Sequence, residues 1–281
     1  MPRTVTVGLD GSAESRAAAE WAVQEAALRG LPVQLVHVWE PVPQPTAGDV
    51  PSEARQRFLD EAAEALRPRL PSAGVTVVQR TGPVVDALVD AAGDAALLVL
   101  GSRALGAVKG FLLGSVGQAV IARTRTPVAV VRAGRAYGGS GPVVLGLDTD
   151  RPDDTLLGFA FEEARRRASA LHVVQGRPVA PYYVYGLEAG AGAWPYDEFA
   201  RQQTARLAEV VRPWRHKHPG VEVVETSRAG GAVDLLLEAA RDASLLVVGR
   251  RVRRGPGAHI GSVAHAVLHH AAVPVAVVAH D

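Results

Sequence analysis

The chain has 281 residues, a length that suggests two domains. Hydrophobic residues make up 48% of it and charged residues 21%, which is the composition of a globular protein with ample apolar surface to bury. Its 30 basic residues nearly balance its 29 acidic residues, and this excludes a strong long-range attraction to nucleic acid or to an anionic membrane. No cysteine is present, which excludes disulfides and thiol chemistry.

The N-terminal sequence MPRTVTVGLDGS enters a strand-like pattern at once, with no charged leader or cleavage site before it. No apolar run along the chain is long enough to span a bilayer. We therefore expect a cytoplasmic protein that does not enter a membrane.

Short aliphatic or β-branched runs alternate with Ala-, Glu- and Arg-rich stretches through the first half of the chain. The expected strands are Val5–Leu9, Val33–Val38, Val75–Gln79, Leu97–Leu100 and Val128–Val131. Between the first two strands, apolar residues recur at helical spacing, and Ser12 is a suitable N-cap for that helix. Uninterrupted apolar strands between helices are typical of parallel sheets covered on both faces. The first half is therefore predicted to be a doubly wound, five-stranded α/β domain of Rossmann-like type.

A glycine-rich stretch, GSRALGAVKGFLLGS (101–115), follows the fourth expected strand and precedes an amphipathic segment. Such a loop before a helix presents main-chain N–H groups to an anion, and the helix dipole favours that anion. The Ser115 hydroxyl can cap the helix or bind a phosphate oxygen. Asp10 ends the first expected strand, near the switch point of such a sheet, where a carboxylate can hold ribose hydroxyls. These features predict a nucleotide site at the carboxyl ends of the strands.

Four segments of the first half recur in the same order in the second half. The matching segments are TVTVGLDGS (4–12) with PVVLGLDTD (142–150), LVHVWE (35–40) with LHVVQG (171–176), AALLVLGSR (95–103) with ASLLVVGRR (243–251), and TPVAVV (126–131) with VPVAVV (273–278). A Gly-rich polar segment at 132–141 separates the two copies. We therefore expect two tandem domains of the same fold, at residues 1–135 and 141–281.

The spacing of the matches indicates where the copies differ in length. The offset is the difference in residue number between matching positions of the two copies. It is 138 at Asp10, 135 at His37 when it is matched with His172, 148 at Gly101 and 147 at Pro127. The second copy is therefore expected to be thirteen residues longer between its second strand and its glycine loop, and one residue shorter after that. The added region, at 178–199, is interpreted as a surface flap, with a lid or a docking loop as the alternative.

The segments VTVGLDGS, LVHVWE, LLGSV and TPVAVVR together resemble the universal stress protein family, in the tandem arrangement of actinobacterial members. The resemblance covers nearly the whole chain. It implies an adenine nucleotide alpha hydrolase-like fold, two domains related by pseudo-twofold symmetry, and antiparallel pairing of their last strands. It also implies a binding pattern of Gly, two residues, Gly, nine residues, Gly and Ser or Thr, which maps to Gly101, Ala104, Gly114 and Ser115.

By the same resemblance, Asp10 meets the ribose, main chain around Val38 meets the adenine edge, and the stretch from Gly101 to Ala107 wraps the phosphates of ATP, with or without Mg²⁺. The residues assigned to the first site are Gly8, Asp10, Val38, Gly101, Ser102, Arg103, Ala104, Gly106, Ala107, Gly114, Ser115 and Val116. The residues assigned to the second site are Gly146, Asp148, Val173, Gly249, Arg250, Arg251, Gly261, Ser262 and Val263.

Both copies depart from the family pattern. Ala104 stands where the pattern has its second glycine, and a positive φ there would cost alanine about 1 kcal/mol. The nearby Gly106 gives the first loop room to adjust. The second loop is one residue shorter, carries Arg251 and Val252 in place of the second glycine, and contains Pro256. A different main-chain path is therefore expected around the second site.

Several of these residues also have a purely structural explanation. Glycines after a strand can simply form tight turns, and Asp10 can form an Asx-turn or cap a helix. His37 and His172 lie within apolar strand patterns, which favours satisfied core residues over catalysts. His265 and His269 are an i, i+4 pair of the kind that binds zinc, but no acidic third ligand lies nearby in the sequence.

The loop does not end in Gly-Lys-Ser/Thr, so it is not a Walker P-loop, and no nucleophile with a base and an orienting partner recurs at the strand ends. We therefore expect binding rather than turnover, with weak ATP hydrolysis as the limit. The expected function is ATP binding in stress response or signalling, with a protein partner or a second copy of the chain as a further partner. Two alternatives stay open, namely an interaction scaffold of the same fold without nucleotide, and a slow ATPase.

Overall fold

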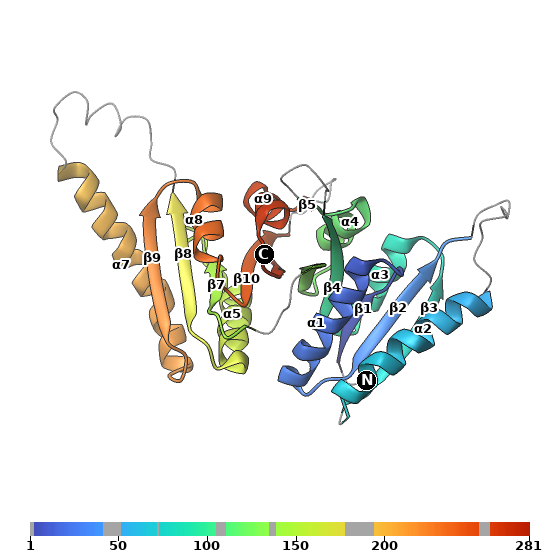
Figure 1. The fold of residues 1–281 in the computed structure, drawn as a ribbon. Helices are drawn as coiled ribbons and strands as arrows, with labels where there is room; N and C mark the ends of the chain where they lie inside the picture. The colour runs from blue at the N-terminus through green and yellow to red at the C-terminus, as the bar shows by residue number, and fades with distance from the viewer. Residues whose placement is uncertain are drawn as a thin grey trace. The chain divides into compact units, whose positions relative to one another are not determined.

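The computed structural model describes residues 3–41, 52–71, 73–104, 111–134, 139–177, 194–252 and 259–281. The chain divides into two compact units. The first unit comprises Met1–Gly138 with Val252–Ile260, and the second comprises Gly139–Arg251 with Gly261–Asp281. Each unit is an α/β domain built around a parallel sheet (Figure 1).

The sheet of the first unit has the strand order β3-β2-β1-β4-β6, and neighbouring strands are parallel. Its strands are β1 (Thr4–Gly8), β2 (Val33–Trp39), β3 (Val75–Thr81), β4 (Ala95–Ala104) and β6 (Val128–Arg132). A two-residue strand, β5 (Phe111–Leu112), pairs antiparallel with the end of β4. The order reverses between β1 and β4, as expected for a doubly wound sheet.

The helices of the first unit are α1 (Ala13–Arg29), α2 (Ser52–Leu66), the short 3-10 helix η1 (Arg67–Arg69), α3 (Val84–Gly93) and α4 (Ser115–Arg123). Helix α1 packs against β1 and β4, whereas α3 packs against β2 and contacts α4 (Figure 1). The expected N-cap is confirmed, because the Ser12 hydroxyl accepts a hydrogen bond from the Ser15 N–H at 3.1 Å.

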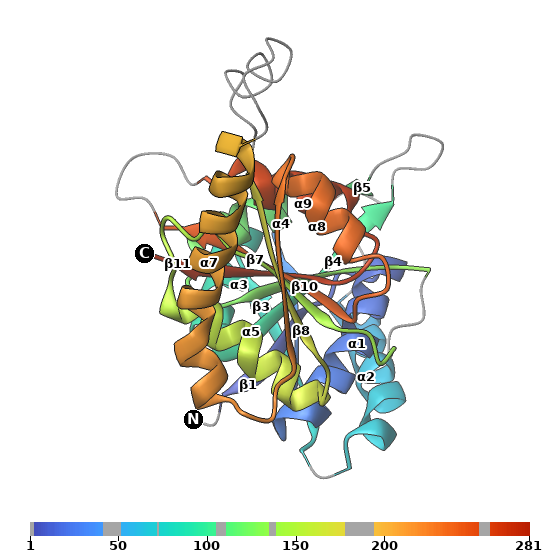
Figure 2. The ribbon, with the colours of Figure 1, turned by 90° about the vertical axis from the view of Figure 1, so that its left-hand side faces the viewer.

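The second unit repeats this arrangement with the strand order β11-β10-β7-β8-β9. Its strands are β7 (Val143–Gly146), β8 (Leu171–Arg177), β9 (Val223–Ala229), β10 (Leu245–Arg251) and β11 (Val275–His280). Its helices are α5 (Asp154–Arg167), α7 (Trp194–Lys217), α8 (Ala232–Ala239) and α9 (Ser262–His270). Helix α7 lies along β9 and contacts α5 (Figures 1 and 2).

The strand register corrects one part of the repeat alignment. In the first unit Gly8 pairs with Val36, and in the second unit Gly146 pairs with Val174, so β2 and β8 have the same offset of 138 residues as β1 and β7. The match of His37 with His172 was therefore wrong, since the register equates His37 with Gln175. It follows that Gly176, and not Val173, corresponds to Val38.

The extra length of the second copy is also smaller than expected. Strands β3 and β9 pair with their neighbours at an offset of 148, through Val75 opposite Val33 and Val223 opposite Leu171. The second copy is thus ten residues longer, and the added residues lie between β8 and β9. Residues 178–193 of the expected flap lie outside the described residues, but its end was misread, because α7 begins at Trp194.

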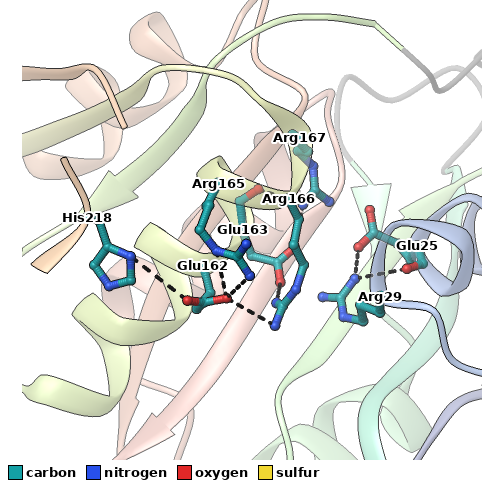
Figure 3. Close-up of polar contacts among 8 residues, drawn as sticks. All are labelled: Glu25, Arg29, Glu162, Glu163, Arg165, Arg166, Arg167 and His218. Atoms are coloured by element: carbon teal, nitrogen blue, oxygen red, sulfur yellow. Dashed lines mark hydrogen bonds and ion pairs between the residues drawn. The ribbon is translucent and has the colours of Figure 1, made fainter. Parts of the chain in front are cut away.

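Helices α1 and α5 carry equivalent ion pairs at the same offset of 138. Glu25 pairs with Arg29, and Glu163 pairs with Arg167, in each case four residues apart and with the carboxylate buried (Figure 3). Buried carboxylates need such partners, because an uncompensated charge in the interior is strongly destabilising. Within the described residues, no helix is long and apolar enough to cross a membrane.

Candidate functional site

The switch point of the first unit lies at the carboxyl ends of β1, β2 and β4 (Figure 1). Strand β1 has β2 on one side and β4 on the other, so the loops that leave β1 and β4 go to opposite faces of the sheet. The residues that follow β1 and those that end β2 and β4 therefore meet at one edge. Asp10, Val38 and Gly101 all belong to this edge.

Asp10 is exposed, and its carboxylate organises the turn that follows β1. Oδ1 of Asp10 accepts hydrogen bonds from the Ser12 N–H at 3.0 Å and from the Ser12 hydroxyl at 2.5 Å. Gly11 has a φ of +87°, a conformation that favours glycine. The structural explanation of Asp10 is therefore correct, since it forms an Asx-turn. A carboxylate has about four acceptor positions, so this turn does not prevent it from receiving ribose hydroxyls as well.

The end of β2 offers main-chain groups beside Asp10. The Leu9 N–H donates to the carbonyl of Val36 at 2.8 Å, on the β1 side of β2. Residues two apart in a strand direct their N–H and C=O groups to the same side, so those of Val38 point past the end of β1. This is the geometry needed to meet the edge of a planar base.

His37 links the ends of β1 and β2 through its side chain. Its Nδ1 lies 2.8 Å from the carbonyl oxygen of Leu9, and because a carbonyl only accepts, Nδ1 carries the proton. In the second unit, Nε2 of His172 lies 2.8 Å from the Thr226 hydroxyl, and burial lowers the pKa of His172. Both histidines have partners, but each is half-buried, so the expectation that they are core residues was wrong.

The glycine-rich stretch begins inside a strand and not in a turn. Gly101 lies within β4 and is level with Val131 of β6. A Cβ on Gly101 would lie 2.6 Å from the main-chain carbon of Glu14 and 2.8 Å from the nitrogen of Ser15, so glycine is needed where α1 crosses β4. The expectation that the fourth strand ends at Leu100 and the glycine-rich stretch follows it was therefore wrong, because β4 continues to Ala104.

Ala104 also lies within β4, where it pairs with Phe111 of β5. The extended main chain of a strand is open to alanine, so the expected cost of a positive φ does not arise there. Gly106 and Ala107 lie outside the described residues, and Arg103 is described by its main chain, which pairs with Leu112.

The β4–β5 hairpin returns the chain toward the switch point. Arg103 pairs with Leu112, so the chain runs antiparallel to β4 as it leaves β5 and approaches α4. Gly114 is the N-cap residue of α4 and provides no side-chain cap. A Cβ on Gly114 would meet nothing within 4 Å.

The first turn of α4 is open to solvent. Ser115 is exposed, and Val116 is 37% exposed although it is apolar. The first N–H groups of a helix have no intrahelical acceptor, and together with the helix dipole they favour an anion. The α4 N-terminus therefore has the form of an anion site at the edge that carries Asp10.

Two other assigned residues face the interior of the first unit. A Cβ on Gly8 would lie 2.9 Å from Leu100 Cδ2, so that glycine serves packing. Ser102 is 1% exposed, and its hydroxyl has no hydrogen-bond partner among the described residues. Gly8 is half-buried and offers an external ligand only its main chain, whereas Ser102 is buried as a whole residue.

The second unit keeps the turn after its first strand but changes the residues around it. Oδ1 of Asp148 accepts from the Asp150 N–H at 3.0 Å, as Asp10 does from Ser12. Thr149 replaces Gly11, and its buried hydroxyl accepts from Nε2 of Gln175 at 2.6 Å. Helix α5 starts later and is capped by Asp153 instead.

The glycines of the second loop also have different surroundings. A Cβ on Gly249 would lie 2.6 Å from Nε2 of His280 and 3.0 Å from the Leu156 side chain in the first turn of α5, whereas a Cβ on Gly101 would meet the main chain of α1. Gly261, the N-cap residue of α9, has a φ of +92°, whereas its counterpart Gly114 has a φ of −58°. The main chain therefore enters the two helices by different paths, as expected from the shorter second loop.

The remaining assigned residues of the second unit divide between surface and interior. Ser262 is exposed and Val263 is 37% exposed, matching Ser115 and Val116. Gly146 packs against Leu236, Arg250 is buried, and Arg251 is half-buried at the end of β10.

Two features lie apart from this edge. The rings of His265 and His269 are 4.4 Å apart between centroids, and no group of three or more metal-binding side chains occurs among the described residues. A groove of about 470 Å³ between α5 and α7 contains none of the assigned residues. It is lined by Pro152, Asp153, Asp154, Thr155, Leu157, Glu209, Val210, Pro213 and Trp214.

The fold defines a class, namely tandem doubly wound α/β proteins. The sequence profile of the universal stress protein family matches residues 1–132 and 140–279. The chain therefore belongs to the universal stress protein family, as its motifs indicated.

Known proteins of the same family extend over the whole chain. A universal stress protein of Mycobacterium tuberculosis is 32% identical over 289 residues, covering 97% of this chain and 96% of that protein. A universal stress protein of Mycolicibacterium smegmatis is 32% identical over 295 residues, covering 98% and 96%. The crystal structure of a universal stress protein from Archaeoglobus fulgidus superposes with a TM-score of 0.70 at 17% identity, covering 99% and 98%. The tandem α/β fold is thereby confirmed.

Proposed function

We propose that this universal stress protein binds ATP at the carboxyl edge of its first unit and acts through nucleotide-dependent contacts in stress response or signalling. The observation that carries the proposal is the return of the β4–β5 hairpin, which runs antiparallel to the end of β4 and leads the chain back to Gly114 at the start of α4. Three kinds of group needed for a nucleotide are then available along one edge.

The main-chain N–H and C=O of Val38 meet the edge of adenine, and the Asp10 carboxylate receives the ribose hydroxyls. The open first turn of α4, with the Ser115 hydroxyl, receives the phosphates, because uncapped N–H groups and the helix dipole favour anions there. Mg²⁺ accompanies the phosphates where the nucleotide brings it. Among the side chains described at this edge, none forms a base and nucleophile pair, which favours binding over turnover.

Substitution of Gly114 by valine tests the phosphate position. A Cβ there meets no atom within 4 Å and Gly114 is exposed, so we expect Gly114→Val to fold normally while filling the space in front of α4. ATP that binds the wild type raises its unfolding free energy by about 2.7 kcal/mol at a free concentration one hundred times Kd. We expect Gly114→Val to lose this increase, as measured by thermal unfolding with and without ATP.

Gly93→Val is the matched control, because Gly93 ends α3 and a side chain there also meets nothing within 4 Å. It should keep the response of the wild type. Retained ATP stabilisation in Gly114→Val would mean that phosphate does not occupy this space.

A second candidate function is an interaction scaffold that binds no nucleotide. It is favoured by the structural roles of two motif residues, because Asp10 forms an Asx-turn and Gly101 makes room for α1. A wild-type melting temperature that does not respond to millimolar ATP, in a protein purified without adenine nucleotide, would support the scaffold.

A further inference from the structure

An aromatic side chain from α2 lies against the turn that follows β1. A Cβ placed on Gly11 would be 3.7 Å from Cζ of Phe58, and the guanidinium of Arg16 lies 5.9 Å from the centre of the same ring. Phe58 is itself half-buried, whereas its neighbour Leu59 is completely buried. The ring is therefore held one residue beyond Asp10 and keeps part of its surface accessible.

The second unit has a different residue at the equivalent position. Helices α2 and α7 align at the offset of 148 that relates β3 to β9. At this offset their fully buried residues coincide, with Leu59 matching Leu207 and Ala63 matching Val211. The position of Phe58 then corresponds to that of Arg206.

Arg206 also contacts the turn after the first strand of its unit, but through charge. Its guanidinium lies 2.8 Å from Oδ1 of Asp150, the counterpart of Ser12. Each unit thus holds this turn from the helix that follows its second strand, with an aromatic ring in the first unit and an ion pair in the second.

We propose that Phe58 is the base platform of the first site and makes that site selective for purine nucleotides. This inference rests on the proposed function, because it requires a nucleotide whose ribose meets Asp10. Phe58 lies against Gly11, the residue after Asp10, so it is close to the position where a base attached to that ribose would lie. The main chain of Val38 supplies contacts at the edge of the base but not at its face. Aromatic rings stack on the faces of bases, and a purine offers a larger face than a pyrimidine.

The second unit has no aromatic ring at the equivalent position, so the same argument gives its site no preference for purines. An Arg206–Asp150 ion pair fills the equivalent position, and the buried Thr149 replaces the glycine against which Phe58 lies. A base near Asp148 therefore has a charged pair beside it in place of a ring.

Affinities of the full chain for ATP and CTP test the platform, because both nucleotides carry the same ribose and triphosphate. The wild type should prefer ATP. Phe58→Leu should weaken ATP binding roughly tenfold, from the usual contribution of base stacking, and weaken CTP binding less, so that the ratio of the two Kd values falls. Phe58→Tyr keeps the ring and should keep the ratio, and Arg57→Leu, at an exposed neighbour on the same helix, should behave as the wild type.

The outcomes separate this inference from the proposed function. An unchanged ratio in Phe58→Leu, with ATP still bound, would overturn the platform and leave the nucleotide site in place. An equal loss of both affinities with a lower melting temperature would assign Phe58 to packing and would also overturn it. A wild type that binds neither nucleotide would overturn the platform together with the proposed function.

Discussion

At the scale of single residues, the two copies solve the same backbone problem differently at the end of their first helices. Gly30 ends α1 with a φ of +63°, and Ala168, its counterpart at the offset of 138, ends α5 with a φ of +48°. The left-handed conformation brings the Cβ of alanine close to the following carbonyl, whereas glycine adopts it without that cost. Ala168 is the one non-glycine residue with positive φ in the described part of the chain.

We therefore expect Ala168→Gly to stabilise the protein by about 1 kcal/mol, since the relief of strain exceeds the entropy that glycine adds to the unfolded chain. Urea unfolding measures the change as a higher midpoint at constant slope. Gly30→Ala should move the midpoint in the opposite direction by a similar amount. A midpoint in Ala168→Gly at or below that of the wild type would show that the left-handed alanine is not strained.

Residue roles were predicted from sequence where they depend on near neighbours. The cap formed by Ser12 and the turn formed by Asp10 are local, because their partners lie within five residues. The role of Gly101 could not be predicted in the same way, because it is set by the main chain of Glu14, which is distant in sequence. The match of His37 with His172 assigned Val173 to the second site for a similar reason. The register is fixed by hydrogen bonds between strands, and an alignment shifted by three residues still matches one histidine with another.

At the scale of elements, β8 and β9 are joined by a side-chain contact that involves a titratable group. The ring of His172 on β8 meets the Thr226 hydroxyl on β9, and burial lowers the pKa of His172 below its ordinary value of 6.5. The unfolded chain therefore binds a proton more readily than the folded one, so this residue stabilises the fold above pH 6.5 and loses that contribution as the pH falls.

Between pH 7.5 and 5.5, the wild type should consequently lose more unfolding free energy than His172→Gln, which retains a hydrogen-bonding side chain that does not titrate. Urea unfolding at both pH values gives the two differences. Equal losses in the two proteins would assign the acid sensitivity to the other histidines of the chain.

Elements that are long and have a clear apolar pattern were predicted, whereas short elements without such a pattern were not. Apolar runs marked all the expected strands of the first unit, but the continuation of β4 to Ala104 and the two-residue β5 carry no such pattern. A strand of two residues exists because its partner is already in place, and a sequence contains no local signal for that. The start of α7 at Trp194 was hidden for the opposite reason, because the prolines and glycines before it are typical of a loop.

At the scale of the whole molecule, the duplication provides an internal comparison for the nucleotide site. Asp10 and Asp148 form the same turn, each accepting through Oδ1 from the main-chain N–H two residues later. Asparagine keeps that acceptor and removes the charge, so Asp10→Asn and Asp148→Asn should both preserve the turn. The two substitutions then differ in their effect only through what each carboxylate binds.

Hydrogen bonds to a charged group contribute about 1.5–3 kcal/mol, so loss of the ribose contact should weaken ATP binding roughly tenfold to one hundredfold in Asp10→Asn. Asp148→Asn should leave the affinity within about twofold, because Thr149, the Asp150–Arg206 ion pair and the positive φ of Gly261 distinguish the second edge from the first. Isothermal titration of the two variants against the wild type gives both Kd and stoichiometry, with one ATP per chain expected. Two bound nucleotides, each removed by its own substitution, would instead show that the second edge binds ATP despite these differences, because main-chain contacts and the α9 N-terminus then suffice without a base platform.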